Sequence, residues 1–401
     1  MSDDAQFKEW VERARAADIF DAAKRCGARL KKAGAGEWVG PCPACGGTDR
    51  FGVNTRDKVW NCRGHGGGQG TIDMVMHAHG LEFVPAVEFI TGEDRPSSAR
   101  QDTPEDHQRR ALAAIKREQE HERRVEAERR SDEDERARDA AEIARVQKIM
   151  VPLEGTHAAA YLKMRGLEPS PRLLKDLGFV DGLEYWGDPM DGEGGLKLLA
   201  ELPAMIARIR DADGAVIGLH RTYLDPHVPK KWAPPNPAPP ARPVNTAKKM
   251  RGRIEGGLIR LGRVTETLAI GEGIETTLAW AAINVDVGAE DVSIAAAGSL
   301  GNMSGGAAGS VDHPWKKRRD GSSLHISNGL PDMEKPGVVL PAGVKRVILL
   351  GDSDSDAAAT YAMLVCGARR FAAQGMETSV HMAPDGLDWA DYWAATGGKT
   401  M

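Results

Sequence analysis

The sequence is poor in cysteine and in aromatic residues, and it contains no long hydrophobic run. Five of its 401 residues are cysteine and 5% are aromatic. An odd and sparse set of cysteines argues against a disulfide framework and is typical of a reducing compartment. The acidic N-terminus is not followed by the apolar segment of a signal peptide, and no run is long enough to span a membrane. We therefore expect a cytoplasmic protein that has no membrane partner.

A large excess of charge of one sign is also missing. The formal net charge is −5, which excludes a uniformly basic nucleic-acid-binding surface but permits a local basic groove. Hydrophobic residues make up 41% of the chain, so most of it can bury a core. At about one domain per 150 residues, this length predicts two to three domains.

Changes in composition divide the chain into four parts. Residues 1–95 are rich in glycine and hold four of the five cysteines. Residues 96–150 are mostly charged, with signs interleaved, which predicts an exposed helical linker stabilised by close pairs of opposite charge; a role in nucleic-acid binding remains an alternative. A globular part resumes at 151–262, and 263–401 forms the last part.

Hydrophobic patterns in the last two parts predict a mixed α/β fold. Residues 205–209 and 216–223 read as strands of a hairpin, and we expect short helices at 158–162 and 173–177. From residue 267 onward, apolar runs alternate with helical patterns, which indicates βαβ units and a mainly parallel sheet. Residues 301–340 are too rich in Gly, Ser, Asn and Pro to form a core element.

Two pairs of soft ligands predict a structural zinc site. Cys42 and Cys45 are separated by two residues, as are Cys62 and His65. Three thiolates and one imidazole are the donors of a closed tetrahedral Zn²⁺ site. The alternative is three ordinary buried cysteines with an incidental histidine. His77 and His79 lie two residues apart on a predicted helix and would face different ways, so we expect them at the surface.

Two groups of acids follow predicted buried strands. Glu272 follows residues 267–270, and Asp352 and Asp354 follow 346–350. Two unit charges about 4 Å apart repel by roughly 4 kcal/mol at an effective dielectric near 20, so a divalent cation is expected among these carboxylates. Glu275 and Asp356 are further candidates, although each could simply stabilise the start of a helix.

Basic residues gather in two places, the second of which also includes a tryptophan. One group follows a Pro-rich loop at 229–243, and its expected role is to bind phosphates, with a solvated loop face as the alternative. The other surrounds the cysteines and could stack on or steer single-stranded DNA, although aromatic residues there could equally form a small core. The first group is Lys248, Lys249, Arg251 and Arg253; the second is Arg50, Trp60 and Arg63.

Residues 42–93 resemble the zinc-binding domain of DnaG-type and phage or plasmid primases. The likeness rests on the paired ligands, a strand at 59–62, a Gly-rich turn, and the segments 70–76 and 81–90. In the commoner pattern the histidine belongs to the first ligand pair. Its place in the second pair here favours a primase of a mobile element over a bacterial housekeeping enzyme.

The C-terminal part looks like a Toprim domain, whose signature is a strand followed by Glu and a later strand followed by Asp-x-Asp. Those positions fall on Glu272, Asp352 and Asp354, and the resemblance nominates Asp385 and Asp388 as further ligands of Mg²⁺ or Mn²⁺. Residues 151–262 are similar to the segment that precedes Toprim in phage and plasmid proteins, where a basic lobe completes the polymerase. The implied architecture is a zinc-ribbon domain (1–95), a charged helical linker (96–150), a basic lobe (151–262) and a Toprim catalytic domain (263–401).

The resemblance implies a DNA primase that joins ribonucleoside triphosphates on a single-stranded DNA template. Glu272 would be a metal ligand or general base, and Asp352 and Asp354 would hold the metal. Because no helicase motif is found, a replicative helicase on a separate chain is the expected partner. A Toprim-type nuclease and a non-catalytic zinc-ribbon protein that binds single-stranded DNA remain alternatives.

Overall fold

The computed structural model describes residues 3–34, 36–96, 104–189, 196–236, 245–284, 292–318 and 321–397. Residues 97–103 of the expected linker and 237–243 of the Pro-rich loop lie outside this part of the chain. The chain divides into two compact units between Arg124 and Val125, and each is described by itself. In the described residues, no helix is both long and apolar enough to cross a bilayer.

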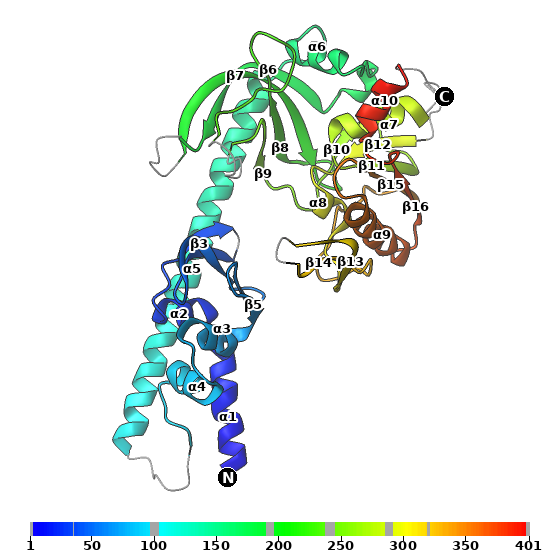
Figure 1. The fold of residues 1–401 in the computed structure, drawn as a ribbon. Helices are drawn as coiled ribbons and strands as arrows, with labels where there is room; N and C mark the ends of the chain where they lie inside the picture. The colour runs from blue at the N-terminus through cyan, green and yellow to red at the C-terminus, as the bar shows by residue number, and fades with distance from the viewer. Residues whose placement is uncertain are drawn as a thin grey trace. The chain divides into compact units, whose positions relative to one another are not determined.

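The first unit is an antiparallel five-stranded sheet flanked by short helices (Figure 1). Its strands follow one another in sequence order, so each pairs with the next along the chain. The elements are α1 (Asp3–Ala16), α2 (Ile19–Arg25), β1 (Lys31–Gly34), β2 (Glu37–Cys42), β3 (Gly46–Asn54), β4 (Val59–Cys62), β5 (Gly66–Gln69), α3 (Gly70–His79) and α4 (Phe83–Thr91).

One core joins the helices of this unit to its sheet. Trp10 of α1 is fully buried and donates its indole N–H to Thr91 of α4 at 3.1 Å. Phe51 of β3 and Met74 of α3 are also inaccessible to water. The strands that carry the cysteines are therefore fixed by packing against helices from both ends of the unit.

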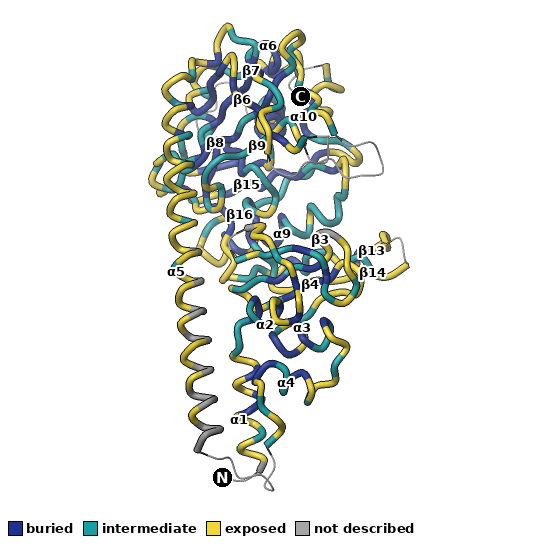
Figure 2. The backbone as a smooth tube through the Cα atoms, turned by 90° about the vertical axis from the view of Figure 1, so that its left-hand side faces the viewer, coloured by how far each residue is buried: buried dark blue, intermediate teal, exposed yellow. Residues whose placement is uncertain are grey.

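The charged segment forms one long helix, α5 (Pro104–Ile149), as the sequence predicted. Exposed ion pairs run along it, such as Arg129 with Glu126 at 2.8 Å. Ile143 and Val146, near its C-terminal end, are buried against the first sheet of the second unit. The remainder of its described length is mostly exposed (Figure 2).

The second unit begins with an antiparallel sheet in the order β6-β7-β8-β9. The predicted hairpin is confirmed by β7 (Lys197–Arg210) and β8 (Val216–Tyr223). The helix expected at 173–177 is wrong, because a 3-10 turn ends at Leu173 and Leu177 already pairs with Ala207. The other elements are α6 (His157–Met164), β6 (Leu177–Gly187) and β9 (Lys248–Gly252).

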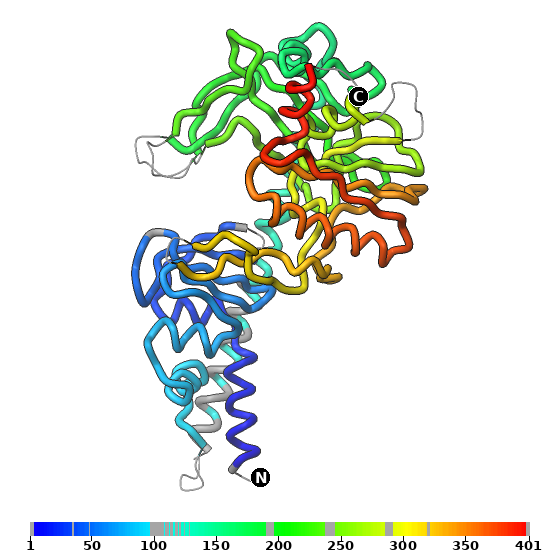
Figure 3. Tube along the Cα trace, turned by 45° about the vertical axis from the view of Figure 1, so that its right-hand side comes forward, coloured from blue at the N-terminus to red at the C-terminus, as the bar shows by residue number. Residues whose placement is uncertain are grey.

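A second sheet has the order β10-β12-β11-β15-β16 and confirms the mixed α/β fold. Its strands β12, β11, β15 and β16 are parallel, and only β10 runs antiparallel. Helix α10 lies beside α7 although the two are distant in sequence (Figure 3). The elements are β10 (Ile259–Leu261), β11 (Thr267–Gly271), α7 (Ile274–Asn284), β12 (Val292–Ala296), α8 (Leu300–Ser304), β15 (Arg346–Gly351), α9 (Ala357–Ala373), β16 (Glu377–Met382) and α10 (Trp389–Ala395).

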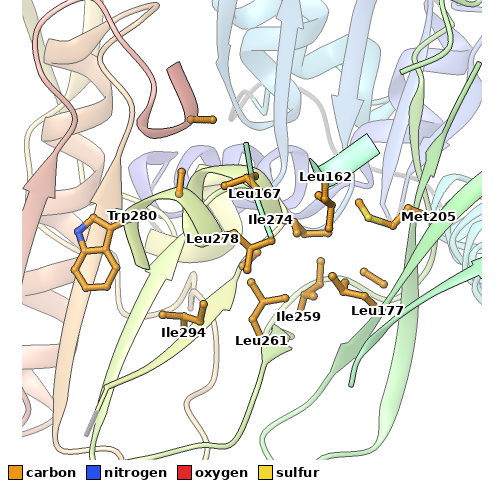
Figure 4. Close-up of a cluster of buried hydrophobic side chains, with 14 of the residues drawn as sticks. Leu162, Leu167, Leu177, Met205, Ile259, Leu261, Ile274, Leu278, Trp280 and Ile294 are labelled. Carbon is orange, nitrogen blue, oxygen red and sulfur yellow. The ribbon is translucent and has the colours of Figure 1, made fainter. Parts of the chain in front are cut away.

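The two sheets of this unit share a hydrophobic core (Figure 4). Met205 from the antiparallel sheet and Ile294 from the parallel sheet belong to the same buried cluster, together with Leu278 of α7. Burying a side chain of this kind contributes about 1.5–3 kcal/mol. The shared core therefore fixes the antiparallel sheet against the end of the parallel sheet.

A hairpin that the sequence did not predict lies within residues 301–340. It consists of β13 (Ser310–Lys317) and β14 (Ser323–Ser327) and packs on α9. Neither strand belongs to the five-stranded sheet. The loops around it are fixed by Arg370 of α9, which is 1% exposed and donates to the carbonyl oxygens of Ser304, Gly306 and Asp332 at 2.8–3.0 Å.

Candidate functional site

The first candidate site is a cluster of cysteine and histidine side chains at one end of the first unit's sheet. Cys42 ends β2, Cys45 lies in the following turn, and Cys62 ends β4. The sulfurs of Cys45 and Cys62 are 3.5 Å apart, and the Cys62 sulfur is 3.9 Å from Nδ1 of His65. The structure therefore brings together the residues expected to bind zinc.

His77 of α3 also belongs to this cluster, and the expectation that it lies at the surface is wrong. Its Nε2 is 3.4 Å from the Cys42 sulfur, and its ring stacks on Trp60 with centroids 4.5 Å apart. The signal in the sequence was the helical stripe of buried residues, since His77 is three positions from Met74, which is fully buried. We call Cys42, Cys45, Cys62, His65 and His77 the Cys/His cluster.

The geometry of the Cys/His cluster fits a tetrahedral zinc ion. Zn–S bonds of about 2.3 Å imply sulfurs roughly 3.8 Å apart, close to the 3.5 Å between Cys45 and Cys62. Two groups of three residues have their ligand atoms within 4.8 Å of one another: Cys42, Cys62 and His77 form one, and Cys45, Cys62 and His65 form the other. Cys62 belongs to both groups. Burial alone would raise the pKa of Cys62, but hydrogen bonds with His65, the Gly64 backbone and the other two thiols lower it to about 6.

The overlap of the two groups predicts unequal effects of ligand substitutions. Because Cys62 is shared, we expect Cys62→Ala to lose zinc, as measured by metal content after gel filtration. We expect His65→Ala to retain one zinc per chain through His77, with lower affinity, and the double variant His65→Ala/His77→Ala to lose it. Cys26→Ala is the control, since Cys26 lies outside the cluster. Loss of zinc from His65→Ala alone would show that His77 does not substitute.

A hollow of about 420 Å³ lies on the sheet of the first unit. Arg50, Trp60 and Arg63, predicted to contact nucleic acid, all line it, together with Trp38, which the sequence did not single out. Trp60 is only 7% exposed and packs near Phe51, so its ring mainly serves the core. The hollow is not uniformly basic, because acidic residues line it too: Glu37, Asp49 and Asp57.

The second candidate site lies at the carboxyl edge of the parallel sheet. Strands β11 and β15 are neighbours, with Ile270 opposite Leu349, so the residues that follow them emerge side by side. These are Glu272 after β11 and Asp352 after β15. A Cβ at Gly271 would lie 2.4 Å from the Thr277 hydroxyl, so only glycine permits this close approach of strand and helix. We call Glu272, Asp352 and Asp354 the acidic edge.

Asp352 is the most constrained member of the acidic edge. It accepts hydrogen bonds from the Thr276 hydroxyl at 3.1 Å and from the Trp389 N–H at 3.3 Å. Burial nevertheless raises its pKa to about 6, and the charges of Asp388 and Asp354 act in the same direction. A carboxylate in this position is disfavoured until a positive charge approaches.

Glu272 responds to the same field. Burial raises the pKa of Glu272. The positive charge of Lys248 lowers this pKa, whereas the negative charge of Asp354 raises it further. Among the described residues, no three carboxylates have ligand atoms within 4.8 Å of one another. The acidic edge is thus a set of neighbouring but separate carboxylates.

The loop before α10 holds the two remaining predicted ligands. Asp388 caps α10 by accepting from the Asp391 N–H, and its charge acts on Asp352. Asp385 is exposed on this loop. Asp388 is therefore near the acidic edge, whereas no contact within the described part of the chain places Asp385 there.

Asp356 caps α9, which was the alternative given for it above. It accepts from the Ala359 N–H at 3.1 Å and pairs with His313 and Lys316 of the hairpin. Burial opposes its ionisation, but the hydrogen bonds from His313 and Lys316 dominate and hold its pKa far below the usual range. Asp356 thus links the β13–β14 hairpin to α9.

Glu275 does not merely stabilise the start of a helix. It is 6% exposed and accepts a hydrogen bond from the Tyr161 hydroxyl of α6. Its two carboxylate oxygens pair with Lys231 at 2.9 Å and Lys248 at 3.2 Å. Burial alone would raise the pKa of Glu275, but Lys248 and Lys231 hold it far below the usual range. We call Glu275, Tyr161, Lys231 and Lys248 the Glu275 cluster; Lys231 was not predicted from the sequence.

The four predicted basic residues of β9 and its end do not form one group. Lys248 lies in the Glu275 cluster, and its charge also acts on Glu272. Lys249 instead donates to the Trp186 carbonyl oxygen at 2.6 Å, and Arg251 lies 2.7 Å from Asp139 of α5. Arg253 is exposed. Lys248 therefore acts on the acidic edge, whereas Lys249 and Arg251 contact Trp186 and Asp139.

Removing the charge of Glu275 should destabilise the protein. Glu275→Gln leaves two neighbouring ammonium groups without their counter-charge, so we expect the free energy of unfolding at pH 7 to fall by about 2 kcal/mol. Urea denaturation measures this. Glu266→Gln is the matched control, because the Glu266 side chain is 70% exposed where it pairs with Lys345, and exposed pairs contribute less than about 1 kcal/mol. Equal effects of the two variants would contradict the role given to burial.

His220 of β8 should make stability depend on pH. It is 6% exposed, and burial, with Lys248 as the next cause, lowers its pKa to about 4. Since the unfolded value is about 6.5, the unfolded chain takes up a proton first, and stability falls as the pH drops from about 6.5 to 4. We expect His220→Leu to reduce this loss, by up to about 3 kcal/mol, in urea denaturation at several pH values. His227→Leu, at an exposed position, should leave the pH dependence unchanged.

Comparisons with known proteins give the following matches. Residues 137–261 match the model of a family described as a domain of unknown function, DUF7146. No curated protein matches the chain.

Solved structures of primases are similar to this chain at low identity. The zinc-binding and RNA polymerase domains of the Aquifex aeolicus primase are 16% identical, with 97% of this chain and 83% of that chain covered, at a TM-score of 0.34. A DnaG primase catalytic domain bound to single-stranded DNA is 16% identical, with 60% and 70% covered, at 0.31. The Escherichia coli primase catalytic core is 15% identical, with 60% and 69% covered, at 0.32. TM-scores this low carry no argument about fold or activity, so function is inferred below from the residues.

Proposed function

We propose that this protein is a DNA primase that synthesises short RNA primers on single-stranded DNA, in the replication of a phage, plasmid or other mobile element. The observation that carries the proposal is the acidic edge. Glu272 and Asp352 follow neighbouring parallel strands, with Asp354 two residues further on and the ammonium group of Lys248 acting on Glu272. Carboxylates beside a fixed cation suit the transfer of a phosphoryl group.

The acidic edge is suited to Mg²⁺ or Mn²⁺, since hard divalent cations prefer carboxylate oxygens. Asp352 and Asp354, with Asp385 and Asp388, would hold the metal, which when bound would supply positive charge to the triphosphate and to the attacking 3′ oxygen. The raised pKa of Asp352 and Glu272 supports this role, because a cation would relieve the cost of their ionisation.

Several side chains would act directly on the substrates. Glu272 would take the proton of the 3′ hydroxyl, and its raised pKa supports this role, because a general base works best when its pKa lies near the working pH. Lys248 and Lys231 are held at one place by Glu275 and are 42% and 38% exposed. Their exposed ammonium groups would bind the triphosphate, while Lys249, Arg251 and Arg253 would contact phosphates of the template.

The first unit would serve template binding. Its Cys/His cluster would hold a structural zinc ion, and Arg50, Trp60 and Arg63 line the hollow that would receive single-stranded DNA. The ribbon, lobe and Toprim boundaries given above follow from the same proposal. A replicative helicase on a separate chain would bring the enzyme to the fork, in a cytoplasm that keeps the thiols reduced.

Substitution of the acidic edge tests the reaction. With single-stranded DNA, labelled ribonucleotides and Mg²⁺ or Mn²⁺, we expect wild type to make short products. Asp352→Asn should reduce the rate at least about a hundredfold, because metal stabilisation of the transition state amounts to several kcal/mol. Asp391→Asn is the control, since Asp391 is a 56% exposed carboxylate on α10. The products are resolved on a sequencing gel.

The same gel separates the alternatives. If the wild type shortens the template and Asp352→Asn does not, the protein is a Toprim-type nuclease and not a primase. Such a nuclease uses water in place of the 3′ hydroxyl. If the wild type binds single-stranded DNA but makes neither primers nor shortened template, the protein is a non-catalytic zinc-ribbon protein.

A further inference from the structure

The β13–β14 hairpin presents an aromatic side chain beside basic residues at its end. Trp315 is 70% exposed, more than any other large hydrophobic side chain in the described part of the chain. Lys316, Lys317 and Arg318 follow it directly, and all three are at the surface. We call residues 310–318 and 321–327 the hairpin arm. Such an exposed indole is unusual, because tryptophan is highly buried on average.

The fold holds Trp315 in this position through His313. The His313 side chain is fully buried, and its Nδ1 accepts from the backbone N–H groups of Trp315 at 3.2 Å and Lys316 at 2.9 Å. Its Nε2 lies 3.0 Å from Asp356, the residue that caps α9. These contacts fix the irregularity in strand pairing between Asp312 and Lys317. The indole is therefore placed at the surface by a buried network and not by chance exposure of a loop.

The cations of the arm are not equivalent. Lys316 pairs with Asp356 at 2.9 Å, so its charge is balanced within the protein. Within the described ranges, Lys317 and Arg318 have no acidic partner. Their positive charges are thus available to an external anion next to the indole.

We propose that the hairpin arm binds single-stranded nucleic acid, with a base stacked on Trp315 and backbone phosphates on Lys317 and Arg318. An aromatic face beside unpaired cations is the combination by which proteins hold unpaired strands. A duplex does not offer the flat face of a base to such a ring, whereas a single strand does. The choice of ligand rests on the proposed function, in which the template or the new primer is a single strand.

Binding measured without synthesis tests this proposal. Fluorescence anisotropy with a labelled single-stranded oligonucleotide and the full-length zinc-loaded protein gives Kd. We expect Trp315→Ala to raise Kd at least about fivefold, since stacking contributes roughly 1–3 kcal/mol per base. Trp315→Phe should stay within about twofold of wild type, because it keeps a ring. The exposure of Trp315 predicts unchanged thermal unfolding for both variants.

Charge is tested by a matched pair of double variants. Lys317→Ala/Arg318→Ala should reduce the slope of log Kd against log salt by about 1.4, because each phosphate contact to a single strand contributes roughly 0.7. Lys345→Ala/Arg346→Ala removes the same charge from two adjacent exposed residues that pair with Glu266 and Glu377, and it should leave the slope unchanged. An equal effect of both double variants would reduce the charge effect to non-specific attraction and overturn the proposal.

The remaining outcomes are distinct. If Trp315→Ala binds the oligonucleotide as wild type does, the proposal fails, and an acidic protein partner becomes the better explanation of the arm. An equal loss of affinity for duplex and single strand would also overturn it. If the wild type synthesises primers and the arm variants bind the oligonucleotide normally, the proposal for the hairpin arm is refuted and the proposed primase function is kept. Weakened binding by those variants, together with absence of primer synthesis by the wild-type protein, would refute the primase and keep the arm as a single-strand-binding site.

Discussion

The architecture of the second unit depends on the burial of one carboxylate, that of Glu275. Moving such a group out of water costs several kcal/mol unless charges of opposite sign meet it, and here Lys231, Lys248 and Tyr161 do so. These partners come from β9, the segment between β8 and β9, and α6, whereas Glu275 lies in the first turn of α7. The ion pairs therefore fix the start of α7, and with it Glu272, relative to the basic residues.

The regular parts of the fold could be predicted from the sequence because they follow local rules. The alternation of apolar runs and helical patterns predicted β11 and β15 close to their observed limits, and the mixed α/β class followed from it. The prediction of a helix at 173–177 was wrong because the pairing of Leu177 with Ala207 overrides the helical pattern of this segment. The hairpin arm was not predicted because β13 has no alternating pattern of buried residues; ion pairs of His313 and Lys316 with Asp356 hold it on α9 instead.

The contacts of the candidate sites were less predictable, since they join residues distant along the chain. Glu275 and Tyr161 are 114 positions apart, and His77 is 35 positions from Cys42. Adjacent residues suggested a helix cap for Glu275 and a surface position for His77, and both readings follow correctly from local sequence alone. The spacing of the cysteines, by contrast, was enough to predict that Cys42, Cys45 and Cys62 come together, because Cys42 ends β2 and Cys62 ends β4.

The way the hairpin arm is attached has a consequence for how this chain can change in evolution. Neither of its strands pairs with the five-stranded sheet, and its flanking loops are held by the Arg370 guanidinium, while the arm itself is tied to α9 through Asp356. Insertions or deletions within the hairpin, between the loop carbonyl groups of Gly306 and Asp332 that Arg370 holds, would therefore leave the strand order of the parallel sheet unchanged. The arm is therefore a segment in which new recognition properties can arise by drift while the parallel sheet stays under selection for its fold.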